Sequence, residues 1–453
     1  MKLFNQLTAL LKKIISNQFI RNLGWLGIAE FSYRFIRLGI VVVLARYLNE
    51  YDYTLGGIVL MVREFALTFS NIGIGAKIIH AEEKELKQLC NSAYWLNWLI
   101  FASLFIIQCL VAFPVAFFKE TPELILPICV SGIAYLIWPI TIIQKNLLQR
   151  ENRFKVIAIT DSILNPLAGL LSALFAFFGM GVWAFALPPV LVAPLEIFIY
   201  LRNHSWRSQM GFTTKYWRSI WNFGRHILGV DLLKTFMNNL DYLVLFLFMT
   251  NTDFKEFSGG YFWAFNAGLG ISLSLIKAIK SAIFPHFCAA RTDLIHLRKR
   301  YFSSLKIIAV IIIPIVILQF SLAPIYVPIV FSAKWSDEVP LFMLICLSAI
   351  PRPFADAASQ LLVAIGKPYL DLVWNFIFTG TYFSMLLIGV NWKNLNNIFI
   401  NESINNNVVS VFGVHWQLMG VAASVLLAHI ICLPLFSIWV TRRIFPKHKS
   451  IVQ

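Results

Sequence analysis

The chain has 453 residues, of which 58% are hydrophobic, 15% are aromatic and 13% are charged. Soluble domains carry about 25% charged residues, so this chain has roughly half the charge that a water-exposed surface needs. The composition excludes a cytosolic enzyme, a nucleic-acid-binding protein and a disordered scaffold. It predicts an all-α polytopic membrane protein.

Twelve hydrophobic runs are long enough to cross a membrane, because a spanning helix needs about 20 mainly apolar residues. In chain order the first six cover residues 22–44, 53–76, 91–118, 124–143, 156–178 and 181–201. The other six cover residues 223–249, 259–284, 304–331, 340–365, 369–391 and 415–440. The fifth and sixth runs are so close together that we expect a tight turn through Gly179.

The basic residues of the loops lie mainly on alternate loops. If the N-terminus is cytoplasmic, the inside loops at 77–87, 145–155, 202–218 and 291–306 hold most of the loop Lys and Arg residues, and the outside loops hold few. Cytoplasmic loops of membrane proteins carry such an excess. We therefore expect both termini in the cytoplasm, and most of the net charge of +16 reflects topology.

The two halves of the chain resemble one another at an offset of about 200 residues. Residues 22–24 (NLG) open the first half and residues 222–224 (NFG) open the second, and glycine pairs at 56–57 and 259–260 follow the first outside loop of each half. Each half has six runs, so the pattern predicts a parallel repeat of two six-helix lobes.

This repeat predicts the domain organisation. The expected parts are an amphipathic interfacial segment (1–21), an N-terminal six-helix lobe (22–202), a cytoplasmic connector (203–222), a C-terminal six-helix lobe (223–441) with a periplasmic insertion (391–416), and a basic cytoplasmic tail (442–453).

Charged residues inside the predicted helices are costly, about 2.5–3.5 kcal/mol each near a helix centre, and they commonly mark a transport path. They concentrate in the first, second, seventh and eighth runs, so we expect these helices to surround a central cationic cavity. Salt bridges that only hold helices together, such as Glu30 with Arg34, are the alternative interpretation. The candidate anion-binding residues are Arg34, Arg37, Arg63, Lys234, Lys277 and Lys280.

No catalytic, metal or cofactor site is expected. The His226 to Asp231 spacing occurs in acyltransferases, but here it falls at the start of a predicted helix. No phosphate-binding loop or HExxH motif is present, and the six cysteines form no CxxC pair. We expect the lipid bilayer as an environment and no nucleic acid as a partner.

Short motifs in a fixed order carry a family resemblance over residues 20–440. They lie at 44–48 (LARYL), 51–53 (YDY), 69–76 (FSNIGIGA), 94–97 (YWLN), 149–154 (QRENRF), 179–184 (GMGVWA), 223–224 (FG), 239–243 (NLDYL), 284–285 (FP) and 361–367 (LLVAIGK). Together they resemble the Wzx or PST-type bacterial polysaccharide flippases, closest to the colanic acid exporter branch. This family lies in the multidrug/oligosaccharidyl-lipid/polysaccharide exporter superfamily, which also contains the MATE exporters.

The resemblance implies a 12-helix fold and a substrate, an oligosaccharide repeat unit on undecaprenyl diphosphate. Alternating access would move this unit from the inner to the outer leaflet of the bacterial inner membrane, without enzymatic activity. A polysaccharide polymerase and chain-length or export machinery are the expected partners. The six bases would contact the diphosphate and sugar phosphates, and proton or sodium coupling would fall to the acids Glu30, Glu64, Asp231 and Asp241.

Three other functions stay open. A MATE-like exporter of cations shares the superfamily, although its cavity should be acidic. A lipid II flippase has a similar cationic cavity but typically two more helices. A membrane polysaccharide polymerase or acyltransferase would usually show larger outside loops. The insertion at 391–416 departs from the family pattern.

Overall fold

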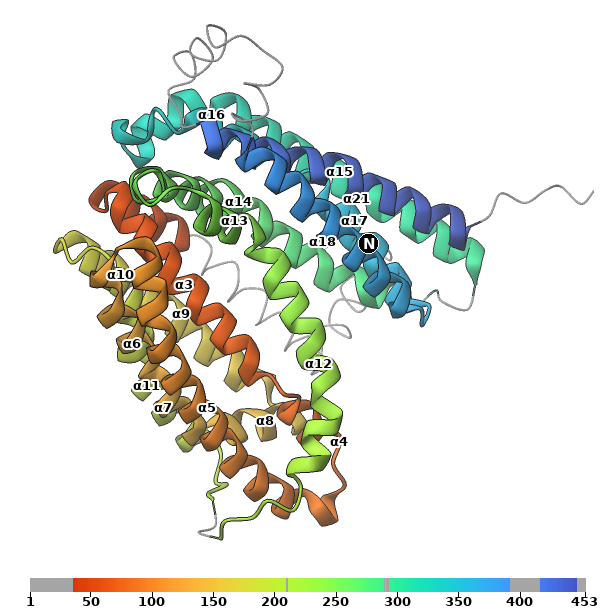
Figure 1. Cartoon of the computed structure of the whole chain (residues 1–453). Coiled ribbons are helices and arrows are strands. Elements are labelled where there is room, and N and C mark those ends of the chain that lie inside the picture. Colours follow the sequence, from red (N-terminus) through yellow and green to blue (C-terminus); the bar gives the residue numbers. More distant parts are fainter. Residues whose placement is uncertain (1–35, 209–210, 289, 291–292, 392–415, 446–453) are drawn as a thin grey trace, which may run out of the picture. The chain divides into compact units, whose positions relative to one another are not determined.

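Residues 36–208, 211–288, 290, 293–391 and 416–445 are described by the structure, a computed structural model, apart from the side chains of residues 80, 270–282 and 284–285. In these ranges the chain forms helices and no strand (Figure 1). Its contacts divide it into two compact units. Unit 1 comprises residues 1–48 and 55–238, and unit 2 comprises residues 49–54 and 239–453.

Unit 1 is a bundle of apolar helices, coloured from red to light green in Figure 1. Residues 36–47 are helical, and α9 and α10 are joined by the expected tight turn, in which Gly179 and Gly181 have φ of 71° and 55°. Glycine adopts such positive φ angles without steric cost. The further helices are α3 (Glu50–Ser70), α4 (Ile74–His80), α5 (Glu83–Lys119), α6 (Ile125–Gly132), α7 (Ala134–Ile137), α8 (Ile142–Arg150), α9 (Phe154–Phe177), α10 (Trp183–Ala186), α11 (Pro188–Asn203) and α12 (Trp217–Asn238).

Unit 2 packs around an aromatic core, in which the Trp263 and Trp335 rings stack with centroids 4.5 Å apart. Its tenth predicted run is split in two, because a new helix begins at Arg352 directly after Pro351. The helices of the unit are α13 (Leu240–Phe248), α14 (Asn251–Cys288), α15 (Leu294–Tyr326), α16 (Val339–Leu347), α17 (Arg352–Ala364), α18 (Pro368–Val390) and α21 (Trp416–Ile444).

Helix α12 belongs to unit 1, although the predicted connector at 203–222 would place it in the C-terminal lobe. The predicted seventh run breaks at Asn239, which separates α12 from α13. On α12, Gly224 lies so close to the Ile72 carbonyl that a Cβ atom would come within 1.6 Å of its oxygen. The Thr235 hydroxyl also lies 2.8 Å from that of Thr68. Backbone contact at a glycine therefore attaches this helix to the segment that follows α3.

The first turn of α3 has its contacts in unit 2, whereas the rest of the helix belongs to unit 1. The Tyr242 hydroxyl donates to the Thr54 carbonyl at 2.9 Å, and a Cβ atom on Gly259 would lie 1.8 Å from the Glu50 carbonyl oxygen. Gly56, one turn later, packs instead against the Phe185 ring of unit 1. The two glycine pairs thus make different contacts, and the internal repeat stays a prediction.

Nine segments of the described chain are long and apolar enough to cross a membrane. They coincide with nine of the twelve predicted runs, and the first run falls largely outside the described residues. The seventh and eighth runs correspond to α12–α13 and to α14, which are not among the nine. Twelve spans therefore stay a prediction.

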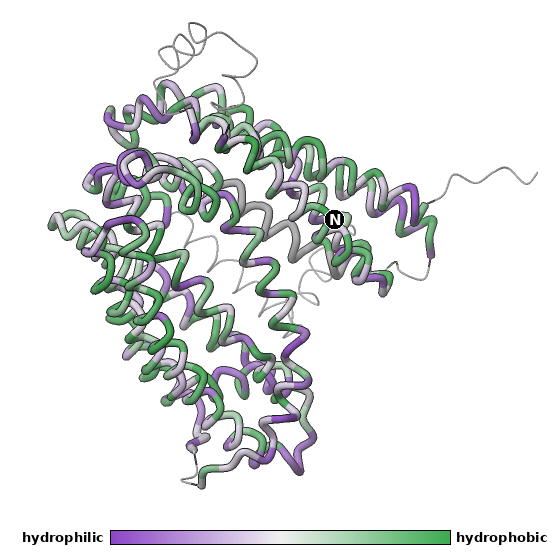
Figure 2. Tube along the Cα trace, viewed as in Figure 1, coloured by the Kyte–Doolittle hydropathy of each residue, from purple (hydrophilic) through white to green (hydrophobic). Residues whose placement is uncertain are grey.

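The exposed surface of the helices is apolar, as expected for helices that contact lipid. Phe117 on α5 is 87% exposed and Val310 on α15 is 73% exposed. Figure 2 shows mainly hydrophobic residues along the helices. Large exposed apolar surfaces are rare on soluble monomers. The chain is therefore a multi-pass membrane protein.

Candidate functional site

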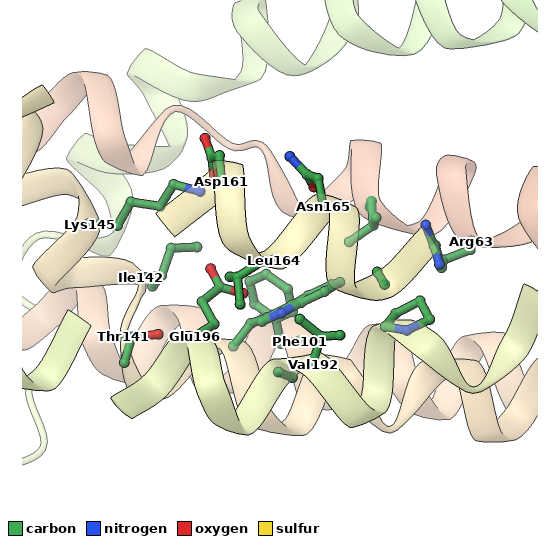
Figure 3. A pocket seen from close by; sticks show the side chains of 15 residues that line it. Arg63, Phe101, Thr141, Ile142, Lys145, Asp161, Leu164, Asn165, Val192 and Glu196 are labelled. Atoms are coloured by element: carbon green, nitrogen blue, oxygen red, sulfur yellow. The ribbon is translucent and has the colours of Figure 1, made fainter. Parts of the chain in front are cut away.

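Unit 1 contains a cavity of about 380 Å³ with polar and apolar walls (Figure 3). This volume lies within the range of small-molecule sites, roughly 300–1,000 Å³. The cavity is lined from α3, α5, α8, α9 and α11 and from the segment between α7 and α8. Its ionisable residues are Arg63, Lys145, Asp161 and Glu196.

The charged side chains come from four different helices. Figure 3 shows Lys145 of α8 directed toward Asp161 of α9, and Arg63 of α3 at the opposite end of the cavity. Asn165 lies one turn after Asp161 on α9, because residues four apart share a helix face. Glu196 projects from α11 on the other side. The cavity therefore presents donors and acceptors from several directions.

The four charged side chains of the cavity form no ion pair with one another or with other described residues, although Glu196 accepts a hydrogen bond from the Trp138 side chain. The Lys145 ammonium lies instead 5.8 Å from the centroid of the Tyr200 ring. Buried or half-buried charges are normally paired, and unpaired ones inside a membrane domain are candidates for function.

One wall of the cavity is aromatic and rigidly supported. Phe101 and Trp138 line it, with ring centroids 6.5 Å apart in an edge-to-face arrangement. Behind them, the Tyr135 hydroxyl donates to the Gln108 side-chain oxygen at 2.7 Å, and the Gln108 amide donates to the Ile128 carbonyl at 2.7 Å. This buried network holds the aromatic wall in place.

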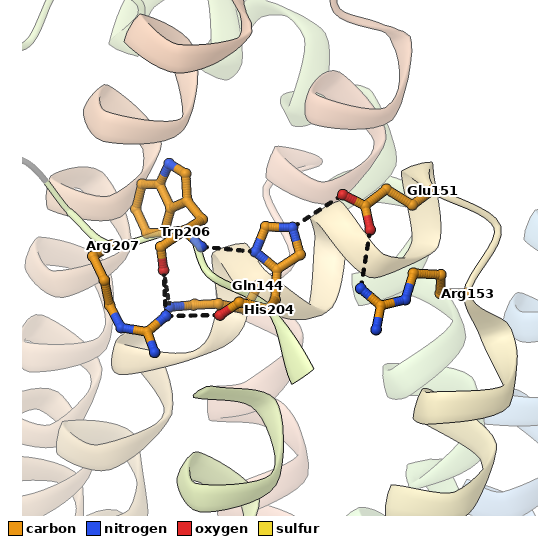
Figure 4. A network of polar contacts seen from close by, with 6 residues as sticks. All are labelled: Gln144, Glu151, Arg153, His204, Trp206 and Arg207. Carbon is orange, nitrogen blue, oxygen red and sulfur yellow. Dashed lines mark hydrogen bonds and ion pairs between the residues drawn. The ribbon is translucent and has the colours of Figure 1, made fainter. Parts of the chain in front are cut away.

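A second network connects the ends of two of the helices that carry the charges (Figure 4). His204, which follows α11, accepts from the Trp206 amide at 3.0 Å through Nδ1, so its proton lies on Nε2 and can be donated to Glu151 at 3.1 Å. Gln144 of α8 donates to the Trp206 carbonyl at 3.2 Å. Helix α8 and the segment that follows α11 are thus tied together beside Lys145.

Unit 2 contains a carboxylate that, unlike Asp161 of the cavity in unit 1, is buried and hydrogen-bonded. Asp241 of α13 is 3% exposed and accepts hydrogen bonds from the Tyr261 hydroxyl at 2.5 Å and from the Tyr242 amide at 2.9 Å. The positive charge of Arg352 also acts on this carboxylate. Asp241 is therefore satisfied by its own unit.

Glu338 precedes α16 in unit 2 and lies outside the candidate spans. It is 4% exposed, and its Oε2 atom has no hydrogen-bond partner among the described residues. A Cβ atom on Gly260 would lie 2.5 Å from its carboxyl group, so that glycine makes room for it. Burial, and then the charges of Glu50 and Asp337, raise the pKa of Glu338 to about 8.

The structure places the predicted anion-binding residues in different surroundings. Arg63 lines the cavity, Arg37 is half-buried in the helix at 36–47, and Lys234 is exposed on α12. Lys277 and Lys280 lie on α14, but their side chains are outside the described part of the chain, and Arg34 falls outside it altogether. The structure therefore does not bring these six residues together in one described site.

None of the three predicted coupling acids that the structure describes lines the cavity. Glu64 is exposed on α3, and Asp231 accepts from the Asn71 amide at 2.5 Å. Asp241 is the buried carboxylate of unit 2, and Glu30 lies outside the described residues.

The sequence analysis missed Lys145, Asp161 and Glu196. A signal was available, because Asp161 lies eighteen residues before Gly179 and Glu196 lies seventeen residues after it. In a helical hairpin that turns at Gly179, equal spacing places two acids at similar depth. Lys145 was assigned to a loop, where its role in a cavity could not be seen.

Comparisons with known proteins agree on family and fold. The sequence profile of the family described as "Polysaccharide biosynthesis protein" matches residues 43–340. The lipopolysaccharide biosynthesis protein WzxC of Escherichia coli (strain K12) is 24% identical over 398 residues, which cover 83% of this chain and 77% of WzxC.

Solved structures with the same fold include two kinds of transporter. The lipid II flippase MurJ in an inward closed conformation matches with a TM-score of 0.67 at 15% identity, covering 92% of this chain and 87% of that one. An inward-facing MATE multidrug resistance transporter matches with a TM-score of 0.65 at 13% identity, covering 92% and 98%. At these identities, the matches show the fold alone.

Proposed function

Because the chain belongs to the polysaccharide biosynthesis protein family, we propose that it is a flippase for an oligosaccharide linked to undecaprenyl diphosphate. It moves this lipid-linked unit from the inner to the outer leaflet of the bacterial inner membrane, where surface polysaccharide is assembled. It acts as a transporter and not as an enzyme. A polysaccharide polymerase and the export machinery would take over the translocated unit.

The observation that carries this proposal is the extent of the family match. The match at 43–340 includes residues of both units, and WzxC is similar over 83% of the chain. The fold itself does not separate a polysaccharide flippase from a multidrug exporter, because MurJ and the MATE transporter match it about equally well. The family assignment therefore favours the lipid-linked oligosaccharide.

Arginine and lysine supply the chemistry for the diphosphate. Arg63, Arg37 and Lys234 of unit 1 would contact it, because guanidinium groups bind phosphate oxygens in a bidentate manner and ammonium groups bind them as point charges. Lys277 and Lys280 of α14, and Arg34, are further candidates.

Translocation proceeds by alternating access, with both termini in the cytoplasm, as the distribution of basic loops predicts. Glu30, Glu64, Asp231 and Asp241 are the candidates for coupling transport to protons or sodium ions. Protonation of a carboxylate inside the membrane domain changes its charge and hence the conformation that is favoured. Transport that ignores imposed proton and sodium gradients would exclude this coupling.

The proposal is tested in bacterial strains that lack their own exopolysaccharide flippase and differ in repeat unit. The wild-type protein should restore surface polymer in at least one strain. Arg63→Ala and Lys234→Ala should reduce polymer at normal membrane levels of the protein, with lipid-linked units accumulating on the inner leaflet. Lys84→Ala is the matched control, because Lys84 is an exposed base at the start of α5.

Two results would contradict the proposal. One is failure of the wild-type protein to restore polymer in any strain despite normal expression. The other is that the protein restores polymer, but lipid-linked units reach the outer leaflet to the same extent in cells with and without the protein.

A further inference from the structure

We propose that the cavity of unit 1 is a sugar-binding subsite, which holds one sugar ring of the oligosaccharide between Lys145, Asp161, Asn165 and Glu196. This inference rests on the proposed flippase function and deepens it. The sugar site is distinct from the bases Arg37 and Lys234. Arg63, at the end of the cavity away from Lys145 and Asp161, borders both the sugar site and the proposed diphosphate site.

The charge balance of the cavity argues for a sugar and against the diphosphate. Two cations, Arg63 and Lys145, face two carboxylates, Asp161 and Glu196. A diphosphate has acceptors alone, so both carboxylates would repel it. A sugar hydroxyl can donate to a carboxylate and accept from an ammonium or amide group, and the wall of the cavity offers all three.

Asp161 makes no hydrogen bond or ion pair with the described residues and Glu196 accepts from the Trp138 side chain, so both carboxylates can still accept from a ligand. Within the described part of the chain, no ion pair or side-chain hydrogen bond joins Asp161 or Glu196 to Lys145. Polar groups inside a membrane domain are costly when left unpaired. Hydroxyl groups of a sugar placed between them would satisfy all of them together.

The apolar wall completes the match to a sugar. Trp138 and Phe101 line the same cavity, as does Leu164. A pyranose ring has an apolar C–H face and a polar rim, so one side of it can pack on an aromatic residue while the rim contacts Asn165 and the acids. The cavity of about 380 Å³ has room for a ligand of this size.

The site is held in shape before a ligand binds. The hydrogen bonds of Gln144, His204 and Glu151 tie α8, which carries Lys145, to the segment that follows α11, which carries Glu196 (Figures 3 and 4). Preorganisation lowers the entropic cost of binding. A preformed cavity can therefore select among sugars by the positions of their hydroxyl groups.

Binding of short-chain lipid analogues to the full-length protein in lipid nanodiscs tests the inference. The probes are farnesyl diphosphate and farnesyl diphosphate linked to a neutral hexose, an N-acetylhexosamine, a 6-deoxyhexose or a hexuronate. At least one sugar conjugate should bind about tenfold tighter than farnesyl diphosphate alone, as expected for hydrogen bonds to charged groups.

Asp161→Asn and Glu196→Gln should each abolish this tenfold gain and leave the affinity for farnesyl diphosphate unchanged. Ser162→Ala is the matched control, because Ser162 neighbours Asp161 on α9 and bonds to the Ala158 carbonyl of its own helix. A thermal unfolding midpoint for each variant ensures that folded proteins are compared.

The outcomes distinguish the two proposals. If farnesyl diphosphate binds but no conjugate binds more tightly, or if the gain survives in both acid variants, the sugar subsite is wrong and the flippase function stands. Lost transport with an intact gain would assign the acids another role, such as proton transfer, and would also overturn the subsite. If neither farnesyl diphosphate nor any conjugate binds, the flippase function fails, and the subsite fails with it.

Discussion

The cavity of unit 1 and the Asp241 site of unit 2 each contain an aspartate carboxylate, and the two carboxylates differ in burial and in hydrogen bonding. Asp161 is exposed to a cavity with no ion-pair partner among the described residues, whereas Asp241 is buried and accepts from Tyr261 and Tyr242. A satisfied carboxylate stabilises its own unit, and an unsatisfied one is available to a ligand. An acid in a hydrophobic helix therefore indicates function only when its partners are known.

Glu338 is intermediate between Asp161 and Asp241 in its surroundings, and its ionisation should have the largest effect on stability. It is buried like Asp241, but one of its carboxylate oxygens has no partner in the described structure. Because burial raises its pKa from 4.5 to about 8, the folded state holds this proton more tightly than the unfolded state does. The contribution of Glu338 to stability should be largest below pH 4.5, fall as the pH rises toward 8, and then level off, a loss of about 4–5 kcal/mol.

Thermal unfolding of the detergent-solubilised protein at pH 5 and pH 8 measures this effect. Glu338→Gln should remove most of the difference between the two midpoints, since the amide carries no charge at either pH. Glu85→Gln, at an exposed acid of α5, should keep the wild-type difference. An unchanged pH dependence in Glu338→Gln would show that this carboxylate is ionised without cost.

Helix α12 belongs to the same unit as the cavity, and a substitution at Gly224 tests how closely this helix packs in unit 1. Gly224→Ala would bring a Cβ atom to 1.6 Å from the Ile72 carbonyl oxygen, so the helix must move away. We expect a loss of stability of about 3 kcal/mol, the upper part of the range for overpacking.

Gly229→Ala is the control on the same helix, because no described atom outside the adjoining helix backbone lies within 4 Å of its Cβ position. It should leave stability unchanged or raise it by up to about 1 kcal/mol, since alanine favours the helix. Equal unfolding midpoints for the two alanine variants would contradict the close packing of α12.

A matched pair of substitutions separates the two carboxylates directly. Asp241→Asn should lower the free energy of unfolding by about 1–3 kcal/mol, because the new amide group cannot accept from both Tyr261 and Tyr242 as the carboxylate does. Asp161→Asn should change it by less than about 0.5 kcal/mol, as for residues without such contacts. Chemical denaturation of both variants under the same conditions measures these free energies of unfolding. A lower value for Asp161→Asn than for Asp241→Asn would contradict the prediction.

Substitution of the two cavity acids should also slow transport, with a smaller effect. Asp161→Asn and Glu196→Gln should each slow translocation of the lipid-linked unit by about tenfold, the loss expected for a hydrogen bond to a charged group. The rate is measured as lipid-linked units reaching the outer leaflet per folded protein, with Ser162→Ala as the control. If both acid variants translocate the lipid-linked unit at the wild-type rate, the cavity does not lie on the transport path.

Features that depend on local composition could be predicted well. The third predicted run at 91–118 lies within α5, and the turn at Gly179 is where the sequence places it. A hydrophobic length or a glycine that adopts positive φ is a property of a few neighbouring residues, and these appear together in the sequence.

Features that depend on distant contacts were missed. The position of Arg63 inside a predicted helix pointed to a role for it, but the sequence could not show that Lys145, Asp161 and Glu196 of three other helices share its cavity. The assignment of α12 to unit 1 likewise depends on contacts of Gly224 and Thr235 with residues more than 150 positions earlier.

The sequence by itself determined that this chain is a membrane protein with a polysaccharide-flippase resemblance, because hydropathy and ordered motifs are read along the chain. The tertiary structure decided which charges are paired and which remain open, because pairing depends on distances between helices that no one-dimensional pattern contains. Asp161 and Asp241 both interrupt hydrophobic helices and look alike in the sequence. Only their neighbours in space distinguish a stabilising carboxylate from one that faces a cavity.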